Sequence, residues 1–468
     1  MSRFPRFGRC AATLLVLAAA LPFAPAAGTA RAAGFQLPPV TRVTLDNGLT
    51  VLVMPTRRLP LVDLRLVVRA GSVDDPAGKE GLAYLTADLM TQGAAARSAK
   101  QIAEDIEFVG GDLSAGADAE RMVVTCEVLK KDLATGIEIF RDVIVQPTFG
   151  AAEFQRKKDE ALAEIASERD DPATVANNQL LPFAWGRHPL GHPAIGWEST
   201  VGTLTRDDVV GFHGRMVRPE RAMLAVVGDV DPQAVIASIK TAFAGWKAGA
   251  GKTAESYSAP SQPVGRRILI VSKPEVTQTQ IRFVCPGVPR NHPDYYPIRV
   301  ANTILGSGFT SRLVNEIRVV QGLTYSISSR FAMNRRAGIY GINTFTRNAT
   351  LRKTIDATLA EARKLREAGP TEAELDKAKR YLTGQYPLGL QAPDDLAEAL
   401  LDVEFYGLAP DYLQTFATRI NAVTMDDTRR ALKSYFCVDE LSILVVSNPE
   451  TAKKDLEGLG PIEVKALE

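Results

Sequence analysis

The sequence predicts an α+β protein of two homologous lobes, each with a mostly antiparallel sheet covered by helices, which face each other around a cleft. Three observations support this fold class. Strand-like runs of alternating residues, such as residues 62–68, are mixed with helical stretches such as residues 154–165 and 351–368. The second half of the chain repeats the pattern of the first, and a segment poor in large apolar residues lies between the two halves.

The repeat is clearest near the end of each half. A block beginning Leu204-Thr-Arg-Asp-Asp precedes the β-branched run 223–229, and a block beginning Val423-Thr-Met-Asp-Asp precedes the similar run 442–448. Each block places a threonine at a helix N-cap before two aspartates. Two earlier strand-like runs, residues 51–54 and 62–68, likewise match residues 268–271 and 279–284. An ordered set of such matches indicates an internal duplication.

The repeat sets the expected domain boundaries. Residues 34–246 form the first lobe and residues 267–468 form the second. Residues 247–266 are rich in Gly, Ala, Ser and Pro, and this composition is typical of a linker.

Residues 1–33 have the pattern of a secretory signal peptide. Three arginines precede the apolar run 11–21, and an Ala-Arg-Ala site follows at residues 30–32. Pro22 and Pro25 leave the apolar run too short for a membrane anchor. We therefore expect an exported protein without a membrane span after cleavage, and the periplasm is the compartment that fits best.

Composition excludes several classes of protein. The 468 residues are 46% hydrophobic and 23% charged, which is average for a globular protein and argues against disorder and coiled coils. The formal net charge is +1, and no basic tract is present that could neutralise a run of phosphates, so a nucleic-acid partner is not expected.

The cysteines do not form a recognisable framework. Cys126, Cys285 and Cys437 remain after signal cleavage, and each lies in an apolar run. A sparse, odd set favours buried thiols, with a Cys285–Cys437 bridge as the alternative. No Cys-x-x-Cys pair is present to suggest a thiolate zinc site.

Histidine-based metal motifs are also missing. His188 and His192 have the i, i+4 spacing of a zinc pair, but two prolines and a glycine around them favour a loop. His213 is expected on a helix and His292 in a turn, both in structural roles. The Gly-Ser-Gly at residues 306–308 lacks the lysine of a phosphate-binding loop and is interpreted as a turn before a helix. The paired aspartates, such as Asp74 and Asp75, are expected to cap helices.

Several ordered motifs resemble one family. Gly71-Ser-Val-Asp-Asp, Gly81-Leu-Ala-Tyr-Leu-Thr-Ala-Asp and Gly110-Gly-Asp-Leu-Ser-Ala resemble the opening domain of the pitrilysin/insulinase metallopeptidases, inverted zincins that include the mitochondrial processing peptidase. Leu305-Gly-Ser-Gly-Phe-Thr-Ser-Arg-Leu and Glu316-Ile-Arg-Val-Val-Gln-Gly-Leu-Thr-Tyr resemble its carboxyl-side domain. The resemblance extends over nearly the whole chain that follows the signal peptide.

The sequence departs from the family at the zinc motif. Active members carry His-x-x-Glu-His, in which two histidines bind zinc and the glutamate activates water. Here the corresponding positions are Tyr84, Ala87 and Asp88. The position of the third zinc ligand is Glu164, and the acidic residue seven positions earlier is replaced by Lys157. The resemblance therefore implies a degenerate site, and we expect no metal or other cofactor in this chain.

The second half retains what the resemblance implies for substrate binding. In active relatives an arginine and a tyrosine of the carboxyl-side domain hydrogen-bond the substrate carbonyl, where negative charge develops. Arg318 and Tyr325 match these two positions.

These features together suggest a division of labour. In two-subunit members of the family one chain carries the zinc motif and the other does not. We expect this chain to be the zinc-free partner of a homologous chain that holds the zinc, donating Arg318 and Tyr325 in trans and helping to bind an extended peptide. One alternative is an inert architectural or peptide-binding protein that kept the peptidase fold. Another is an autonomous hydrolase that uses other residues.

Overall fold

The computed structural model describes residues 37–249, 257–260 and 265–467. The expected signal peptide at residues 1–33 lies outside the described residues, as do residues 250–256 and 261–264 of the expected linker. The chain from Leu37 onward forms one unit. Among the described residues, no helix has both the length and the apolar character that crossing a bilayer requires.

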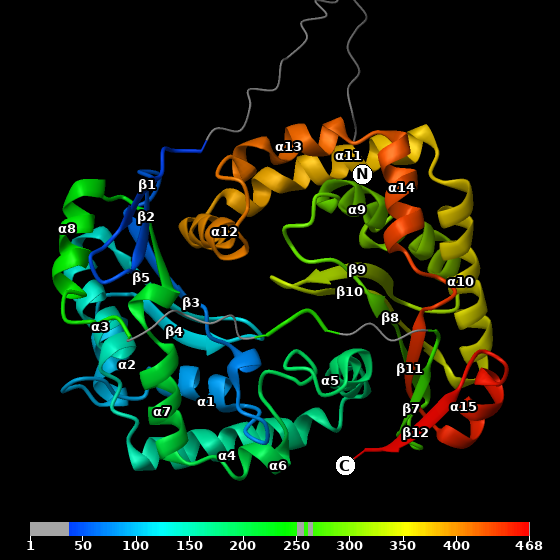
Figure 1. Ribbon diagram of the computed structural model, residues 1–468, viewed down its shortest axis with the longest axis horizontal. Coiled ribbons are helices and arrows are strands. Elements are labelled where there is room, and N and C mark those ends of the chain that lie inside the picture. Colours follow the sequence, from blue (N-terminus) through cyan, green and yellow to red (C-terminus); the bar gives the residue numbers. More distant parts are fainter. Residues whose placement is uncertain (1–36, 250–256, 261–264, 468) are drawn as a thin grey trace, which may run out of the picture. The chain divides into compact units, whose positions relative to one another are not determined.

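Two six-stranded sheets form the framework (Figure 1). In the first, the strand order is β1-β2-β6-β3-β5-β4, and in the second it is β12-β7-β11-β8-β10-β9. The strands of the first sheet are β1 (Thr41–Thr44), β2 (Thr50–Pro55), β3 (Leu61–Val68), β4 (Asp112–Ala117), β5 (Met122–Leu129) and β6 (Ala222–Gly228). Those of the second are β7 (Ile268–Ser272), β8 (Gln278–Pro286), β9 (Ile327–Met333), β10 (Gly338–Arg347), β11 (Ser442–Ser447) and β12 (Ile462–Ala466).

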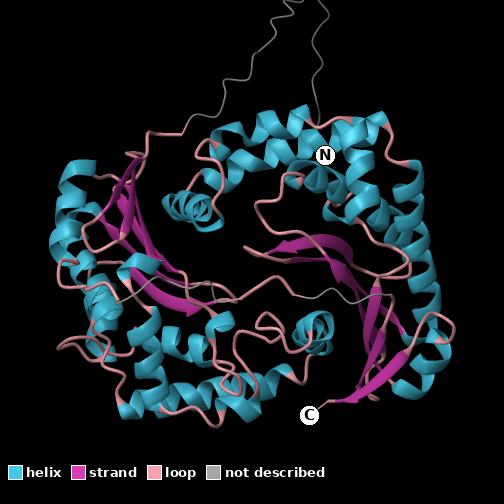
Figure 2. Cartoon of the chain, viewed as in Figure 1, coloured by secondary structure: helices cyan, strands magenta, loops and turns pink. Residues whose placement is uncertain are grey.

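Helices surround both sheets (Figure 2). In the first half they are α1 (Leu82–Leu89), α2 (Ala99–Phe108), α3 (Leu133–Val145), α4 (Ala151–Glu168), α5 (Pro172–Trp185), α6 (Glu198–Val201), α7 (Arg206–Met216) and α8 (Pro232–Ala242). In the second half they are α9 (Tyr295–Asn302), α10 (Leu351–Ala368), α11 (Glu372–Gln385), α12 (Pro393–Tyr406), α13 (Tyr412–Ala422), α14 (Met425–Tyr435) and α15 (Pro449–Leu456). Two π-helical segments, η4 (Thr303–Ser307) and η5 (Val314–Val320), follow α9.

The two halves share one topology, which confirms the predicted α+β duplication. The order β2-β6-β3-β5-β4 of the first sheet repeats as β7-β11-β8-β10-β9 in the second, and most neighbouring strands are antiparallel. The matching helices α7 and α14 start with the same capping box, in which Thr205 caps the amide of Asp208 and Thr424 caps that of Asp427. The sheets differ only at one edge, because β1 pairs antiparallel with β2 whereas β12 pairs parallel with β7.

The first sheet buries one face under its own helices. Inward-facing residues of β3 and β5 alternate along each strand and pack under α1 and α3. Leu64, Leu66, Val124 and Cys126 are each fully or almost fully buried there. This core fixes α1, and with it the predicted zinc-motif positions.

The second sheet is covered on its other face by a helix from the first half. The apolar side of α5 packs on β8 and β11, where Val175, Leu180 and Phe183 share a cluster with Val284 and Leu444. Burial of this apolar surface holds α5 in place, together with hydrogen bonds from charged side chains of the second half, such as Arg282 to Asn177 Oδ1 at 2.9 Å and Lys465 to Gln179 Oε1 at 2.9 Å.

The first sheet receives α12 of the second half in return. α12 packs against β3 and β6, but its contact with the sheet is partly ionic. Its carboxylates face arginines in or beside the strands in four ion pairs, Arg42–Glu404 at 2.8 Å, Arg65–Glu398 at 3.3 Å, Arg121–Asp402 at 2.8 Å and Arg121–Glu398 at 4.0 Å. The halves therefore exchange equivalent helices, and arginines of the receiving sheets hydrogen-bond α5 and form ion pairs with α12.

A cavity of about 900 Å³ lies mainly within the first half, where its lining includes Ile165, His192 and Trp197. From the second half, Lys465 and Leu467 also line it.

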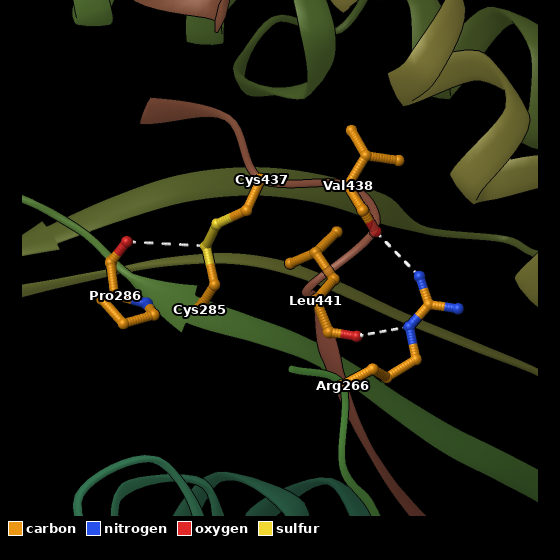
Figure 3. Close-up of a disulfide and its surroundings, with 6 residues drawn as sticks. All are labelled: Arg266, Cys285, Pro286, Cys437, Val438 and Leu441. Atoms are coloured by element: carbon orange, nitrogen blue, oxygen red, sulfur yellow. Dashed lines mark hydrogen bonds between the residues drawn. A yellow bond between two sulfur atoms is a disulfide. The ribbon is translucent and has the colours of Figure 1, made fainter. Parts of the chain in front are cut away.

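The structure corrects the preferred interpretation of the cysteines as buried thiols. Cys285 at the end of β8 and Cys437 between α14 and β11 form a disulfide (Figure 3), while Cys126 is buried and free. Cys437 lies next to Phe436, whose ring contacts Tyr340 of the neighbouring strand β10. Arg266 donates to Leu441 O at 2.9 Å and to Val438 O at 2.8 Å. These two bonds fix the connection between α14 and β11 that carries Cys437.

The disulfide predicts a reductant-sensitive stability. It joins positions 152 residues apart, so its loss releases a long loop in the unfolded chain, and we expect a cost of about 2–4 kcal/mol. Thermal unfolding with and without dithiothreitol should show a lower midpoint for the reduced wild type and no reductant effect for C285A/C437A. The C126A variant should remain reductant-sensitive. Equal midpoints for reduced and oxidised wild type would contradict the expectation.

The segment that carries Arg318 is anchored by a charged pair. Arg312 donates to both carboxylate oxygens of Glu374 on α11, at 2.7 and 2.8 Å, and to Gly369 O at 3.3 Å. The guanidinium hydrogen bonds lower the pKa of Glu374 to about 2. The pair therefore fastens η5 to α11 over most of the pH range.

This ion pair predicts a pH-dependent contribution to stability. Because the pKa of Glu374 is lower in the folded state, its contribution is present above about pH 4.5 and is lost as the pH falls toward 2. At neutral pH, E374Q should lower the free energy of unfolding by about 1 kcal/mol, and its difference from wild type should shrink on acidification. Chemical denaturation between pH 7 and 2.5 measures this difference in the free energy of unfolding. E104Q is the control, because Glu104 belongs to an exposed ion pair with Lys100. A difference independent of pH would contradict the assignment.

Candidate active-site positions

The helix that carries the zinc-motif positions begins at a tight cap. Asp75 accepts hydrogen bonds from the backbone amides of Gly81 and Ala83, each at 2.8 Å, as expected for a capping aspartate. Burial raises the pKa of Asp75 to about 8, although both amides favour the carboxylate. Gly81 has a φ of 103°, which favours glycine at the start of α1.

α1 presents different residues to the core and to α4. Leu82, Leu85 and Leu89 are buried in the first core, whereas Tyr84 and Asp88, one helical turn apart, are half-buried on the side that meets α4. The positions that would hold two histidines in an active relative therefore face the helix that carries Glu164.

The first ligand position is joined to the third by a hydrogen bond. The Tyr84 hydroxyl donates to Glu164 Oε2 at 3.0 Å. Burial, followed by the charge of Glu164, raises the pKa of Tyr84 above its ordinary value, so the phenol stays protonated at neutral pH.

The second ligand position is neutralised by an ion pair. Lys157 of α4 lies 3.1 Å from Asp88 Oδ1 and 3.2 Å from Glu160 Oε2. Partial burial works to lower the pKa of Lys157, but the two carboxylates outweigh it and raise the pKa above its ordinary value. The Lys157 ammonium therefore remains charged and stays paired with the Asp88 carboxylate.

These side chains do not fit a zinc site of the inverted-zincin type. Ala87, at the position of the water-activating glutamate, is fully buried in the core. Of the remaining donors, one is a protonated phenol and one is a carboxylate paired with lysine, and neither is a good zinc ligand in that state. In the part of the chain that the structure describes, no three His, Cys, Asp or Glu residues form a group able to hold a metal ion.

The histidines have structural contacts, as the sequence predicted. His188 and His192 lie in the turns after α5, where His188 contacts Ser258 O and the ring of Tyr257. His213 lies on α7 with its Nε2 atom 2.9 Å from Ile144 O, and burial lowers its pKa to about 4. His292 lies in a turn before α9.

The structure brings Arg318 and Tyr325 together. The guanidinium carbon of Arg318 lies 4.8 Å from the centroid of the Tyr325 ring. Tyr325 is 76% exposed, and Arg318 is half-buried on η5. An exposed tyrosine beside an accessible guanidinium provides hydrogen-bond donors to a ligand at the surface.

The backbone around this pair is well fixed. η5 is π-helical, a form often found at functional sites, and its Ile317 side chain is fully buried. Thr346 of β10 donates to Leu323 O at 2.7 Å, and Thr344 donates to Ser326 O at 2.9 Å. These bonds hold the loop that carries Tyr325 against the second sheet.

Two groups of predicted residues thus remain separate. Tyr84 contacts Glu164, and Arg318 contacts Tyr325, but no hydrogen bond, ion pair or ring contact joins the two groups within the described residues. Phe309, whose ring lies 5.3 Å from the Arg318 guanidinium, was not predicted from the sequence. Its position in the Gly-Ser-Gly-Phe motif was the available signal, but that motif was interpreted as a turn and as part of the family resemblance, with no role for the phenylalanine.

Comparisons with known families match both halves. Residues 51–197 match the family described as "Insulinase (Peptidase family M16)". Residues 203–382 match the family described as "Peptidase M16 inactive domain".

Similar proteins cover most of the chain. An uncharacterized zinc protease of Mycobacterium leprae is 32% identical over 368 residues, which are 77% of this chain and 80% of that protein. An uncharacterized zinc protease of Mycobacterium tuberculosis is 33% identical over 363 residues, which are 75% of this chain and 80% of that protein.

Solved structures agree with this relationship. The crystal structure of a peptidase M16 inactive domain from Pseudomonas fluorescens aligns with a TM-score of 0.82 and 28% identity, covering 87% of this chain and 98% of that one. A protease from Helicobacter pylori shares the fold, with a TM-score of 0.81 at 22% identity, covering 88% of this chain and 100% of that one. Both halves match models of this family, relatives of 32% and 33% identity cover about three quarters of the chain, and a solved structure of the family shares its fold. The chain therefore belongs to peptidase family M16.

Proposed function

We propose that this chain is the zinc-free subunit of an exported, heteromeric metalloendopeptidase. It contributes Arg318 and Tyr325 to peptide hydrolysis at a site whose zinc and general base lie on a homologous partner chain. The observation that carries the proposal is a contrast between two sets of positions. The zinc-motif positions are occupied by Tyr84–Glu164 and Asp88–Lys157 contacts, whereas Arg318 and Tyr325 lie together at an exposed surface.

Electrostatics support a role for Arg318 at the substrate carbonyl. Its guanidinium makes no ion pair within the described residues, so its charge is available to an incoming oxygen. Donors that are already oriented stabilise the oxyanion of peptide hydrolysis most effectively.

An extended peptide would also need a backbone partner. β4 is the last strand of the first sheet, so one side of it has no strand neighbour among the described residues. Addition of a peptide strand at such an edge supplies affinity through main-chain hydrogen bonds. The signal-like sequence at residues 1–33 supports assignment to the periplasm.

The proposal predicts that the isolated chain lacks tightly bound zinc. After dialysis, metal analysis should find far less than one zinc per wild-type chain. Y84H/A87E/D88H, which restores His-x-x-Glu-His beside Glu164, should gain about one zinc per chain, because imidazole donors now act together with the carboxylate. Adding E164A to this variant should abolish the gain. Stoichiometric zinc in the wild type would refute the zinc-free assignment.

The trans site predicts that Arg318 is needed for hydrolysis by the complex. A tag on this chain recovers the native complex from its own cells, and the partner is accepted only if it carries His-x-x-Glu-His and zinc. R318A should lower kcat for an unfolded polypeptide by about 100-fold, the effect of losing one oxyanion donor. Y325F should also lower kcat, and the distant exposed control R419A should not.

Two outcomes would reject this function. If R318A hydrolyses peptide as the wild type does, the trans site is wrong. If the wild-type complex cleaves no unfolded polypeptide, the architectural alternative is supported instead.

A further inference from the structure

Phe309 is an exposed aromatic residue with a defined contact. Its side chain is 76% exposed, yet its ring centroid lies 5.3 Å from the Arg318 guanidinium carbon, close to the 4.8 Å of the Tyr325 contact. Arg318 thus contacts two aromatic rings from different segments. Core packing does not explain Phe309, because most of its surface faces solvent.

The two rings orient Arg318 without neutralising it. Arg312, six residues earlier in the chain, is paired with the carboxylate of Glu374. Arg318 has only ring contacts among the described residues. A cation–π contact restricts the guanidinium while its N–H groups remain free to donate to a ligand.

The turn that presents Phe309 is rigidly seated. A Cβ atom at Gly306 would lie 2.6 Å from Ser329 Oγ, so only glycine lets η4 approach β9 this closely. Buried Asn302 completes the junction, donating to Ser329 O at 3.0 Å and accepting from Ser329 Oγ at 2.7 Å. These contacts fix η4, the segment directly before the turn that presents Phe309, and a supported backbone is what a preorganised site requires.

We infer that Phe309 is a positioning residue for Arg318 and that its exposed ring meets the substrate. The inference rests on the proposed function and adds a substrate class to it, namely peptides with a large apolar side chain next to the carbonyl that Arg318 binds. Exposed Val319 and Val320 on the same segment, 68% and 64% exposed, add to the apolar character of this surface. Phe309 and these valines lie in the chain segment that also holds Arg318, so an apolar side chain and a carbonyl can bind there together.

The test uses the native complex with two peptides of equal length, one with a central Leu-Phe pair and one with a central Ser-Ala pair. F309L keeps an apolar side chain but removes the ring, and F309W keeps a ring. F309L should lower kcat/KM for the Leu-Phe peptide by about fivefold, as expected for a lost exposed cation–π contact. F309A should lower this kcat/KM further and reduce the preference for the Leu-Phe peptide. F309W should keep both the kcat/KM and the preference of the wild type.

A matched control separates this role from general surface effects. Phe108, 92% exposed in the first half, has no arginine contact among the described residues, so F108A should leave both peptides unaffected. In the isolated chain, the Arg318 side-chain protons should show an upfield ring-current shift in NMR spectra that decreases in F309L and persists in F309W. R318K identifies these signals.

The outcomes distinguish the inference from the function beneath it. If R318A is inactive but F309A and F309L match the wild type, Phe309 has no positioning role and the proposed function stands. If F309L is as active as F309W, the ring itself is not needed and the inference is overturned. If R318A is fully active, the proposed function fails and the substrate assignment fails with it.

Discussion

The reciprocal exchange of α5 and α12 is the constraint on which the arrangement of this chain depends. Each sheet has one face covered by its own helices, and the other face receives a helix from the opposite half. Neither sheet could bury both faces alone, because an exposed second face would leave apolar residues such as Met54 and Val227 in water. The exchange therefore fixes the two halves in one unit.

The two exchanged helices are held in physically different ways. α5 combines apolar burial with hydrogen bonds from the buried Arg282 of β8 to Asn177 Oδ1 and Ala173 O. At the α12 face, Arg121 lies between Asp118 and Asp402 at 2.8 Å from each, and its guanidinium also lies over the Phe405 ring. Partly buried charges depend on their partners, because removing one leaves the other desolvated and unpaired. The α12 contact thus depends on paired charges, whereas the α5 atoms that Arg282 meets are uncharged acceptors.

Side-chain contacts join α1 to α4 at the positions that resemble a zinc motif. A metal would cross-link α1 to α4, and here the Tyr84–Glu164 hydrogen bond and the Asp88–Lys157 ion pair join the same two helices. Ala87 fills the adjoining core. Membership of family M16 describes this scaffold, and the chemistry has to be argued from the side chains that remain.

Sequence reasoning succeeded where the signal is local. Strand alternation, the Thr205 and Thr424 caps and the duplicated order of elements are encoded within short windows, so the lobes could be predicted. The Cys285–Cys437 bridge could not, because 152 residues separate its ends and no local pattern pairs them. The exchange of helices escaped prediction for the same reason.

For the candidate site, the resemblance indicated positions without their contacts. Tyr84, Asp88, Glu164, Arg318 and Tyr325 stay predicted site residues, and the structure adds what each of them touches. The roles of Lys157 and Phe309 depend on distances across helices and turns, which a linear pattern does not contain.

The two sets of positions differ in how their charges are satisfied, and this difference favours a functional surface around Arg318. At the zinc-motif positions, Asp88 and Glu164 each have a partner, as expected where only stability matters. Around Arg318, an arginine without an ion pair in the described chain lies among exposed Phe309, Val319 and Tyr325. Exposing such residues gains nothing for the folded chain alone, whereas a contiguous apolar surface with an available guanidinium suits a polypeptide ligand. The contrast within one chain is therefore one between positions whose charges are paired and a surface whose guanidinium keeps its N–H donors for a ligand.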